Sequence, residues 1–285
     1  MVGSGAMGRG IAQVTASSGL RTRLNDVDQA QLKSAEHAID HDLDVGVRRG
    51  KLDPAAKARA LANLELTSDL ATAAADADVV IEAVTEDLGV KAAVFAELDA
   101  RAPEGCVLAT NTSALSVTEL AATTRRPDRV VGLHFFNPVP RMALVEIIRG
   151  LETAEEVINW STDFVRKLGK EPVVVNEYPG FAVSRINAMI GNEAFYMLME
   201  GVATARDIDT AMKLGLNHPM GPFELGDLVG WDVRLKVLEH LHRTLGDKFR
   251  PCPLLLKYVA SGRLGRKSGR GVFDYPATSE AAASR

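Results

Sequence analysis

The sequence predicts an α/β protein in which a mainly parallel sheet, with helices on both faces, is followed by an all-helical domain. Up to Asn176, short β-rich runs alternate with helical stretches, the order typical of a parallel sheet. From 181 to about 261, apolar residues recur at three- and four-residue spacing, as in amphipathic helices. The break at Tyr178-Pro179-Gly180 separates the two patterns. We therefore expect one domain over 1–176 and a second over 177–285.

The elements follow from apolar runs and their flanks. Residues 28 to about 50 are expected to form a long, mostly polar helix. The helical part should begin with an apolar stripe made of Ile186, Met189, Ile190, Ala194 and Met197. A last short strand is expected at Gly271-Val272-Phe273, before an Ala/Ser-rich tail from Ala277 that we expect to be disordered. The other predicted strands are Leu20–Asn25, Asp78–Ala83, Cys106–Thr110, Val130–Phe135, Leu144–Ile148 and Pro172–Asn176.

Composition narrows the class of protein. Among the 285 residues, 46% are hydrophobic and 25% are charged, as in ordinary globular proteins. A net charge of -4 argues against a nucleic-acid partner, which needs a basic surface. The two cysteines, Cys106 and Cys252, indicate neither a disulfide nor a metal site. Without a signal-like start or a membrane-length apolar run, we expect a cytoplasmic protein with no membrane partner.

The first eight residues carry a glycine pattern, G-x-G-x-x-G, that leads into a helix over Arg9–Ser17. In a dinucleotide-binding turn, Gly3 permits the tight turn, Gly5 lets the backbone approach a pyrophosphate, and Gly8 lets the helix pack on the sheet. The N–H groups at the helix start then hold the phosphates. An ordinary glycine turn is the alternative. The residues expected to bind the cofactor here are Gly3, Ser4, Gly5, Ala6, Met7 and Gly8.

Asp26 strengthens the dinucleotide interpretation. It ends the strand that follows the glycine helix, eighteen residues after Gly8. A carboxylate there accepts both ribose hydroxyls of the adenosine half and repels a 2′-phosphate. No arginine follows Asp26, so NAD is favoured over NADP. Asp26 as a helix N-cap is the alternative, although Asp28 can cap that helix instead. Together these features predict a Rossmann-like dinucleotide-binding domain.

The strand ahead of the glycine turn is unusually short. Only Met1 and Val2 precede Gly3, whereas a strand normally runs about five or six residues. This strand is central in such sheets, and shortening it leaves hydrogen-bonding groups of its neighbours unpaired. We therefore expect a truncated first strand, with the true start of the chain upstream.

His134 is the strongest catalytic candidate among six histidines. It ends an apolar strand, at the edge where open α/β sheets place ligands. Glu146 lies between aliphatic residues, so its carboxylate needs a partner. A turn near 138–140 can bring the strands of His134 and Glu146 side by side, so that the two side chains meet. A histidine oriented by a carboxylate can take the proton when a hydroxyl is oxidised. A buried structural His–Glu pair is the alternative.

A histidine pair on the long polar helix has the spacing of a possible metal site. His37 and His41 lie four residues apart on the long polar helix. No third ligand is evident, so a solvated helix face is favoured and no metal is expected.

Motifs along the chain resemble those of the 3-hydroxyacyl-CoA dehydrogenase family. They are, in order, GSGAMGRGIAQ, NTSAL, GLHFFNPVP followed by LVEI, YPGF, DIDTAMKLG and PMGPFEL. They cover nearly the whole chain apart from the missing first strand, so chance is negligible. The resemblance implies an enzyme that uses NAD and an acyl-CoA substrate and forms a homodimer through its helical domain.

The resemblance also implies roles for individual residues. His134 corresponds to the catalytic acid/base and Glu146 to its orienting partner. Ser113 matches a serine that contacts both substrate and cofactor near the reacting carbon. The remaining cofactor-binding matches are Glu86, Lys91, Asn137 and Lys267.

One position departs from the family pattern. Family members often have an asparagine that helps hold the substrate carbonyl where this chain has Ser184. Serine is shorter but can still donate one hydrogen bond. Asn187 lies about one helical turn later and is the alternative donor.

A basic patch, Arg48-Arg49-Gly50-Lys51, ends the long helix. It either complements the helix dipole or, because the family binds CoA near this helix pair, contacts the CoA phosphates.

The predicted function is the interconversion of a short-chain (S)-3-hydroxyacyl-CoA and its 3-oxoacyl-CoA by hydride transfer to NAD. We expect 3-hydroxybutyryl-CoA as substrate, in fatty-acid metabolism by β-oxidation or in butyrate-type metabolism. A β-hydroxyacid dehydrogenase is a same-fold alternative, but that class typically uses a catalytic lysine. A non-catalytic relative that retains NAD binding, such as a lens crystallin of this family, is opposed by the intact His134, Glu146 and Ser113.

Overall fold

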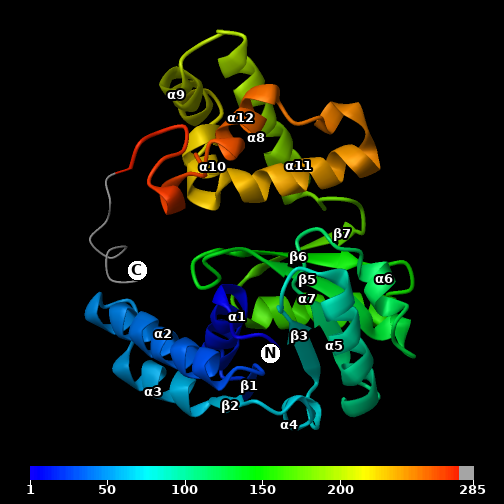
Figure 1. Ribbon diagram of the computed structural model, residues 1–285. Coiled ribbons are helices and arrows are strands. Elements are labelled where there is room, and N and C mark those ends of the chain that lie inside the picture. Colours follow the sequence, from blue (N-terminus) through cyan, green and yellow to red (C-terminus); the bar gives the residue numbers. More distant parts are fainter. Residues whose placement is uncertain (276–285) are drawn as a thin grey trace. The chain divides into compact units, whose positions relative to one another are not determined.

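The computed structural model describes residues 1–275, which form two compact units (Figure 1). The first unit, Met1–Tyr178, is built of strands and helices, and the second, which begins at Pro179, is helical. The predicted fold class is therefore confirmed. The division falls two residues after the one expected from the sequence.

The sheet of the first unit has two parts joined side by side. One part has the order β1-β2 and the other the order β3-β4-β5-β6-β7 (Figure 1). All neighbouring strands are parallel except β5 and β6, which are antiparallel. Strand β2 was not predicted, because its short run LELT has no fully buried residue. The strands are β1 (Thr22–Asn25), β2 (Leu64–Thr67), β3 (Val79–Glu82), β4 (Val107–Thr110), β5 (Val130–Phe135), β6 (Leu144–Arg149) and β7 (Glu171–Asn176).

The segment Met1–Gly3 takes the place of a strand between β1 and β3. The Val2 N–H donates to the Ile81 carbonyl at 2.9 Å, and the Gly3 N–H donates to the Asn25 carbonyl at 2.8 Å. Behind Met1, a cavity of about 550 Å³ extends between the two parts of the sheet. The glycine turn is thus anchored to both neighbours.

Helices cover both faces of the sheet. Alternate residues of β5 point to opposite faces of the sheet. Val131 and Leu133 pack in one core cluster with residues of α1 and α7. Gly132 faces the other way, where a Cβ would lie 3.1 Å from Val117 of α6. The helices of the first unit are α1 (Ala6–Ser17), α2 (Gln29–Arg48), α3 (Pro54–Ala62), α4 (Leu70–Ala74), α5 (Leu88–Arg101), α6 (Val117–Ala121) and α7 (Glu155–Lys167), with a 3-10 turn at Pro127–Arg129.

Side-chain caps fix where several helices begin. Asp28 accepts hydrogen bonds from the Ala30 and Gln31 N–H groups and so caps α2. The alternative role for Asp26, as the cap of this helix, is therefore wrong. Asp87 caps α5 in the same way, by accepting from the Val90 N–H. Both caps place the following helix close after the end of a strand.

The second unit encloses an aromatic core. Phe195 packs edge-on against Trp231, with ring centroids 4.6 Å apart, and against Phe223 at 5.3 Å. Buried Asp227 accepts from the Trp231 indole N–H at 2.6 Å. The helices are α8 (Val183–Met199), α9 (Ala205–Gly215), α10 (Pro222–Val229), α11 (Trp231–Leu245) and α12 (Pro253–Ala260), with 3-10 turns at Asp247–Phe249 and Arg266–Ser268.

The predicted stripe of α8 is partly wrong. Ile186 is 62% exposed and Met189 is 43% exposed. The buried face instead contains Ala188, Gly191 and Phe195. A side chain at Gly191 would lie 3.2 Å from Arg234, so this small residue lets α11 pack closely. The small residues at the contact gave a weak signal in the sequence, whereas the large apolar side chains of Ile186 and Met189 lie on an exposed face.

The predicted strand at Gly271-Val272-Phe273 is also wrong. The segment has isolated bridges, Gly265 with Arg270 and Arg270 with Asp274, but forms no strand. Its N–H groups are used differently, because Val272 and Phe273 donate to the Asp227 carboxylate at 2.9 Å each. The tail from Ala277 lies outside the described residues.

Candidate active site

The glycine turn leaves open space in front of α1. Gly3 has φ +89°, and a Cβ on it would lie 2.7 Å from the Ala83 carbonyl oxygen. A Cβ on Gly8 would lie 1.8 Å from the Gly3 carbonyl oxygen, so neither position accepts a side chain. A Cβ on Gly5 would meet nothing within 4 Å, and no side chain caps this helix start. Uncapped N–H groups facing open space fit a pyrophosphate.

Asp26 lies beside this turn. Its Oδ2 accepts from the Ser4 N–H at 2.8 Å and from the Ser4 hydroxyl at 2.7 Å. Partial burial opposes ionisation, but the hydrogen bonds from Ser4 and Asp28 outweigh it and lower the pKa of Asp26. The carboxylate is therefore ionised at neutral pH. Its position at the end of β1 fits the adenosine ribose of a bound dinucleotide and disfavours a 2′-phosphate.

A buried ion pair occupies the ends of β3 and β4. The Lys91 ammonium lies 2.7 Å from Glu82 Oε1 and 3.2 Å from Glu86 Oε2. The side chains of Lys91 and Glu82 are 1% and 0% exposed. Glu86 Oε1 also accepts from the Ser113 N–H at 3.0 Å. The predicted residue Glu86 therefore contacts two others, Lys91 and Ser113, and Lys91 also contacts Glu82, which was not predicted.

His134 and Glu146 form the second buried pair. They are directly opposite each other in the antiparallel register of β5 and β6, and His134 Nδ1 lies 2.8 Å from Glu146 Oε2. Both side chains are buried. His134 lies on the face of β5 opposite Val131 and Leu133, so alternation turns it away from the core of α1 and α7. The carboxylate can thus set the orientation and tautomer of the imidazole.

Two further side chains, Lys170 and Asn111, hold β5 and the loop that follows it. The buried Lys170 ammonium donates to the carbonyls of Val139 and Met142, at 2.7 Å each. Burial lowers the pKa of Lys170. Asn111 Oδ1 accepts from the Phe135 N–H at 2.9 Å and so ties the NTSAL segment to the strand that carries His134. Asn137 is exposed in this loop.

Matches to models of known protein families show the family to which this chain belongs. The 3-hydroxyacyl-CoA dehydrogenase NAD binding domain matches residues 1–178, and the C-terminal domain of the same family matches residues 180–275. The chain belongs to the 3-hydroxyacyl-CoA dehydrogenase family. It is an NAD-dependent oxidoreductase, so the predictions of family, enzyme class and cofactor are confirmed.

Individual relatives of this dehydrogenase agree along the whole chain. A probable 3-hydroxybutyryl-CoA dehydrogenase of Bacillus subtilis is 46% identical over 280 residues, with 96% of each chain covered. A 3-hydroxyadipyl-CoA dehydrogenase of Escherichia coli is 43% identical over 99% of this chain, which spans 59% of that protein. The crystal structure of (S)-3-hydroxybutyryl-CoA dehydrogenase PaaH1 from Ralstonia eutropha matches with a TM-score of 0.93 and 44% identity, and 96% and 97% of the two chains are covered.

Other predicted residues of the dehydrogenase lie in the second unit. Ser184 is in the first turn of α8 and is half-buried. Asn187 Oδ1 accepts two hydrogen bonds from the Arg234 guanidinium, at 3.1 Å each. Arg234 is itself buried, and burial lowers its pKa to about 10. The Lys267 ammonium forms an ion pair with Asp232 at 2.6 Å.

The basic patch of the dehydrogenase lies at the end of α2. Arg48 is in the last turn of the helix and Arg49 is its C-cap residue. Both are exposed, as is Lys51. This placement suits the helix dipole and also leaves the cations accessible to an anion.

Sequence reasoning missed Glu82, Asn111 and Lys170. The signal for Glu82 was present, since a carboxylate inside the apolar run VVIEA needs a partner just as Glu146 does. Lys170 follows a helix and resembles an ordinary solvated lysine in sequence, so its burial could not be foreseen. In residues 1–275, no group of three or more His, Cys, Asp or Glu side chains is arranged to hold a metal ion, and no helix there is long and apolar enough to cross a membrane.

Proposed function

We propose that His134 is the acid/base of the dehydrogenase reaction and that Glu146 orients it. The 2.8 Å contact between His134 Nδ1 and Glu146 Oε2 carries this proposal. With Nδ1 paired to the carboxylate, proton exchange with the substrate falls to Nε2. When Nε2 takes a proton, the nearby carboxylate stabilises the imidazolium. The pair is therefore suited to repeated gain and loss of one proton.

The oxidation removes one hydride and one proton from the 3-hydroxyacyl substrate. When bound, NAD would supply the acceptor for the hydride that leaves the carbon carrying the hydroxyl. His134 removes the hydroxyl proton as the C–O single bond becomes a carbonyl, and returns it in the reverse direction. Ser113 donates a hydrogen bond to the substrate oxygen and so favours the developing charge. The glycine turn and Asp26 would hold the adenosine diphosphate half of the cofactor, Asn137 would lie close to the nicotinamide, and Glu86, Lys91 and Lys267 would contribute further contacts to the cofactor.

We propose a short-chain (S)-3-hydroxyacyl-CoA, 3-hydroxybutyryl-CoA, as the substrate. Relatives that bear this substrate in their names are 44 to 46% identical over 96% of the chain. The test follows NADH oxidation with acetoacetyl-CoA and with longer 3-oxoacyl-CoA substrates. The highest kcat/KM should belong to the four-carbon acyl chain. A higher kcat/KM for a longer chain or for a dicarboxylic acyl-CoA would contradict this assignment.

At the departing position, we favour Ser184 over Asn187 as the donor to the substrate carbonyl. The Asn187 oxygen already accepts two hydrogen bonds from Arg234. Those bonds orient its amide as part of the helix pair α8 and α11. Replacement Ser184→Ala should raise the KM for acetoacetyl-CoA, whereas Ser184→Asn should keep it near the wild-type value. If Ser184→Asn raised the KM and Ser184→Ala did not, Ser184 would not be the donor to the substrate carbonyl.

We propose that Arg48, Arg49 and Lys51 contact the phosphates of CoA. Two observations support this proposal: all three residues are exposed, and their positive charges lie together at the end of α2. Neutralising all three should raise the KM for acetoacetyl-CoA and leave the KM for NADH unchanged. An unchanged KM for both would assign the patch to the helix dipole alone.

Three expectations about the setting complete the proposal. Exposed apolar side chains on the second unit, among them Leu214 at 82%, support a homodimer through that unit, which light scattering tests.

Two buried free cysteines suit a reducing cytoplasm, which cell fractionation tests. The substrate assigns the enzyme to fatty-acid β-oxidation or to butyrate-type metabolism.

A further inference from the structure

We propose that Glu82 is a positioning residue of the dehydrogenase, acting on Ser113 through Lys91 and Glu86. No expectation from the sequence gave Glu82 a role. The inference rests on the proposed role of Ser113 at the reacting carbon. It concerns only residues of the first unit.

The first observation is the placement of two opposite charges in the interior. Glu82 and Lys91 are among the most buried polar residues of the molecule. Taking two charges out of water opposes the attraction between them, and an apolar pair of the same size is often as stable. Simple stabilisation of the fold therefore does not account for this pair.

The second observation is that every oxygen of Glu82 is engaged. Oε1 accepts from the Lys91 ammonium at 2.7 Å and from the Val84 N–H at 2.6 Å. Oε2 accepts from the Thr110 hydroxyl at 2.8 Å. One carboxylate thus joins the ends of β3 and β4 to α5. Its position is fixed from three sides.

The third observation is the direction in which the contacts continue. From Lys91 they lead to Glu86, and Glu86 Oε1 then accepts from the Thr112 hydroxyl at 2.5 Å and from the Ser113 N–H at 3.0 Å. The Glu86 side chain is 43% exposed, and within residues 1–275 its carboxylate is held by contacts with Lys91, Thr112 and Ser113. The buried pair, together with the Thr112 hydroxyl, therefore holds in place the half-exposed carboxylate that accepts from the Ser113 N–H.

A comparison within α5 separates positioning from stability. Asp99 near the other end of this helix is also a buried carboxylate with cationic partners, Arg125 and Arg126, at 2.8 Å each. The Arg126 guanidinium also donates to the carbonyls of Asp99 and Ala102, so this cluster closes on the end of the helix. Asp99→Asn is therefore the matched control, a buried ion-pair loss on the same helix that does not lead to Ser113.

The test measures kcat/KM for acetoacetyl-CoA at saturating NADH, together with Tm. Glu82→Gln leaves the Lys91 ammonium to Glu86 alone, which draws Glu86 away from the Ser113 N–H. We expect a loss of about tenfold, and the same loss for Glu86→Gln. Because both act through one chain of contacts, the double variant should lose about tenfold and not about a hundredfold.

Two outcomes overturn the proposal. One is a Glu82→Gln enzyme with wild-type kcat/KM, and the other is a double variant whose loss is the product of the two single losses. Asp99→Asn should lower Tm, leave kcat/KM unchanged and, in combination with Glu86→Gln, add no further loss of turnover. A loss of turnover in Asp99→Asn would show that any damage to α5 lowers activity.

A second pair of changes guards against misfolding. Glu82→Leu combined with Lys91→Met replaces both buried charges by apolar side chains and leaves no unpaired charge, so Tm should fall less than in Glu82→Leu alone, although the Val84 N–H and the Thr110 hydroxyl lose their acceptor. Turnover should nevertheless stay low, because Glu86 has lost its contact with Lys91. Recovery of both Tm and turnover would make the pair purely structural. The proposed function fails separately, through an active His134→Ala enzyme, so the two failures are distinguishable.

Discussion

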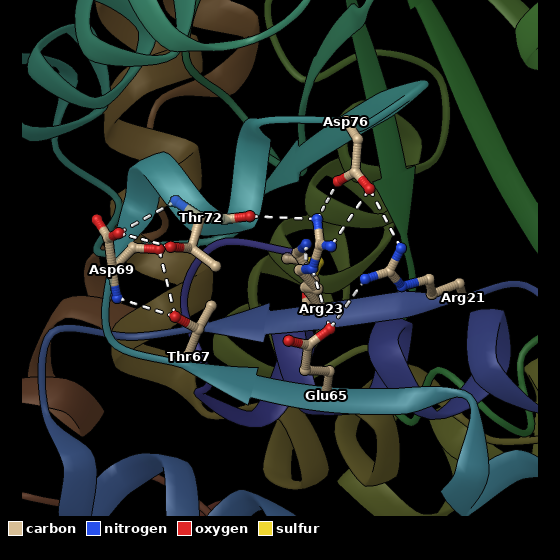
Figure 2. A network of polar contacts seen from close by, with 8 residues as sticks. Arg21, Arg23, Glu65, Thr67, Asp69, Thr72 and Asp76 are labelled. Carbon is tan, nitrogen blue, oxygen red and sulfur yellow. Dashed lines mark hydrogen bonds and ion pairs between the residues drawn. The ribbon is translucent and has the colours of Figure 1, made fainter.

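Two groups of charged residues in the first unit illustrate different uses of ion pairs. At one end of the sheet, Arg21, Arg23, Glu65 and Asp76 form a network on the surface (Figure 2). Arg21 and Asp76 there are 65% and 54% exposed, whereas Arg23 at 14% is largely covered. At the opposite end, the pairs Glu82–Lys91 and His134–Glu146 are buried.

The difference between the groups is their access to water. Water and salt screen the surface charges, so several contacts contribute little in total. Inside the protein, each buried group lacks a replacement partner, so losing one contact has a large effect. The number of contacts is therefore a poor guide to importance here, and burial is the better one.

The largest effect is expected for His134→Ala, which removes the group that exchanges the proton. Turnover of acetoacetyl-CoA should fall by about a hundredfold or more, the usual scale for a general acid/base. Steady-state NADH oxidation measures it. Wild-type activity in this variant would remove the buried pair from the mechanism.

Glu146→Gln should have the next largest effect. The amide keeps the shape but no longer stabilises a protonated imidazole, so we expect a fall in kcat of about tenfold or more. The KM for NADH should stay unchanged, which is the control for an intact cofactor site. A kcat equal to that of the wild type would mean that Glu146 only fills space.

Asp26→Ser should alter cofactor preference more than turnover. Without the carboxylate, the ribose hydroxyls lose an acceptor and a 2′-phosphate is no longer repelled. The ratio of kcat/KM for NADH to that for NADPH should fall by about tenfold or more, roughly one strong hydrogen bond in free energy. An unchanged ratio of the two kcat/KM values would mean that Asp26 does not contact the adenosine ribose.

Asp99→Asn should act on stability alone and in a pH-dependent way. Burial raises the pKa of Asp99, but hydrogen bonds from Arg125 and Arg126 outweigh it, so the folded pKa lies below the usual value. The stabilisation is present above the unfolded pKa of about 3.9 and is lost as pH falls through the lower folded pKa. In urea, the difference between wild type and variant should be full at pH 7 and shrink below pH about 4. A difference independent of pH would point to packing.

The smallest effect is expected in the surface network of Figure 2, where Arg21→Ala should change Tm by little more than the error of measurement. Turnover should be unaffected. A large drop in Tm would mean that exposed ion pairs matter as much as buried ones in this unit. The comparison between the two groups would then fail.

Much of this arrangement could be predicted from the sequence, for identifiable reasons. The strand over Val130–Phe135 was predicted with its observed bounds, because all of its residues are buried and apolar except His134. The glycine turn and Asp26 follow a spacing that a phosphate and a ribose dictate. His134 and Glu146 stood out because a polar group in an apolar run must be paired.

Other features depended on contacts that no local pattern contains. The face of α8 is decided by the close approach of α11 at Gly191, which an apolar periodicity does not register. The residues Val272 and Phe273 look like a strand, but Asp227, some 45 positions earlier, takes their N–H groups. The link from Glu82 to Ser113 passes through three segments, so only the folded chain reveals it.

The most direct test of the central claim is a crystal structure of the enzyme with NAD and acetoacetyl-CoA bound. The account predicts His134 Nε2 within hydrogen-bond distance of the 3-oxygen, about 2.6 to 3.2 Å, with Nδ1 still paired to Glu146. A different side chain at that distance from the 3-oxygen, with His134 turned away, would contradict it.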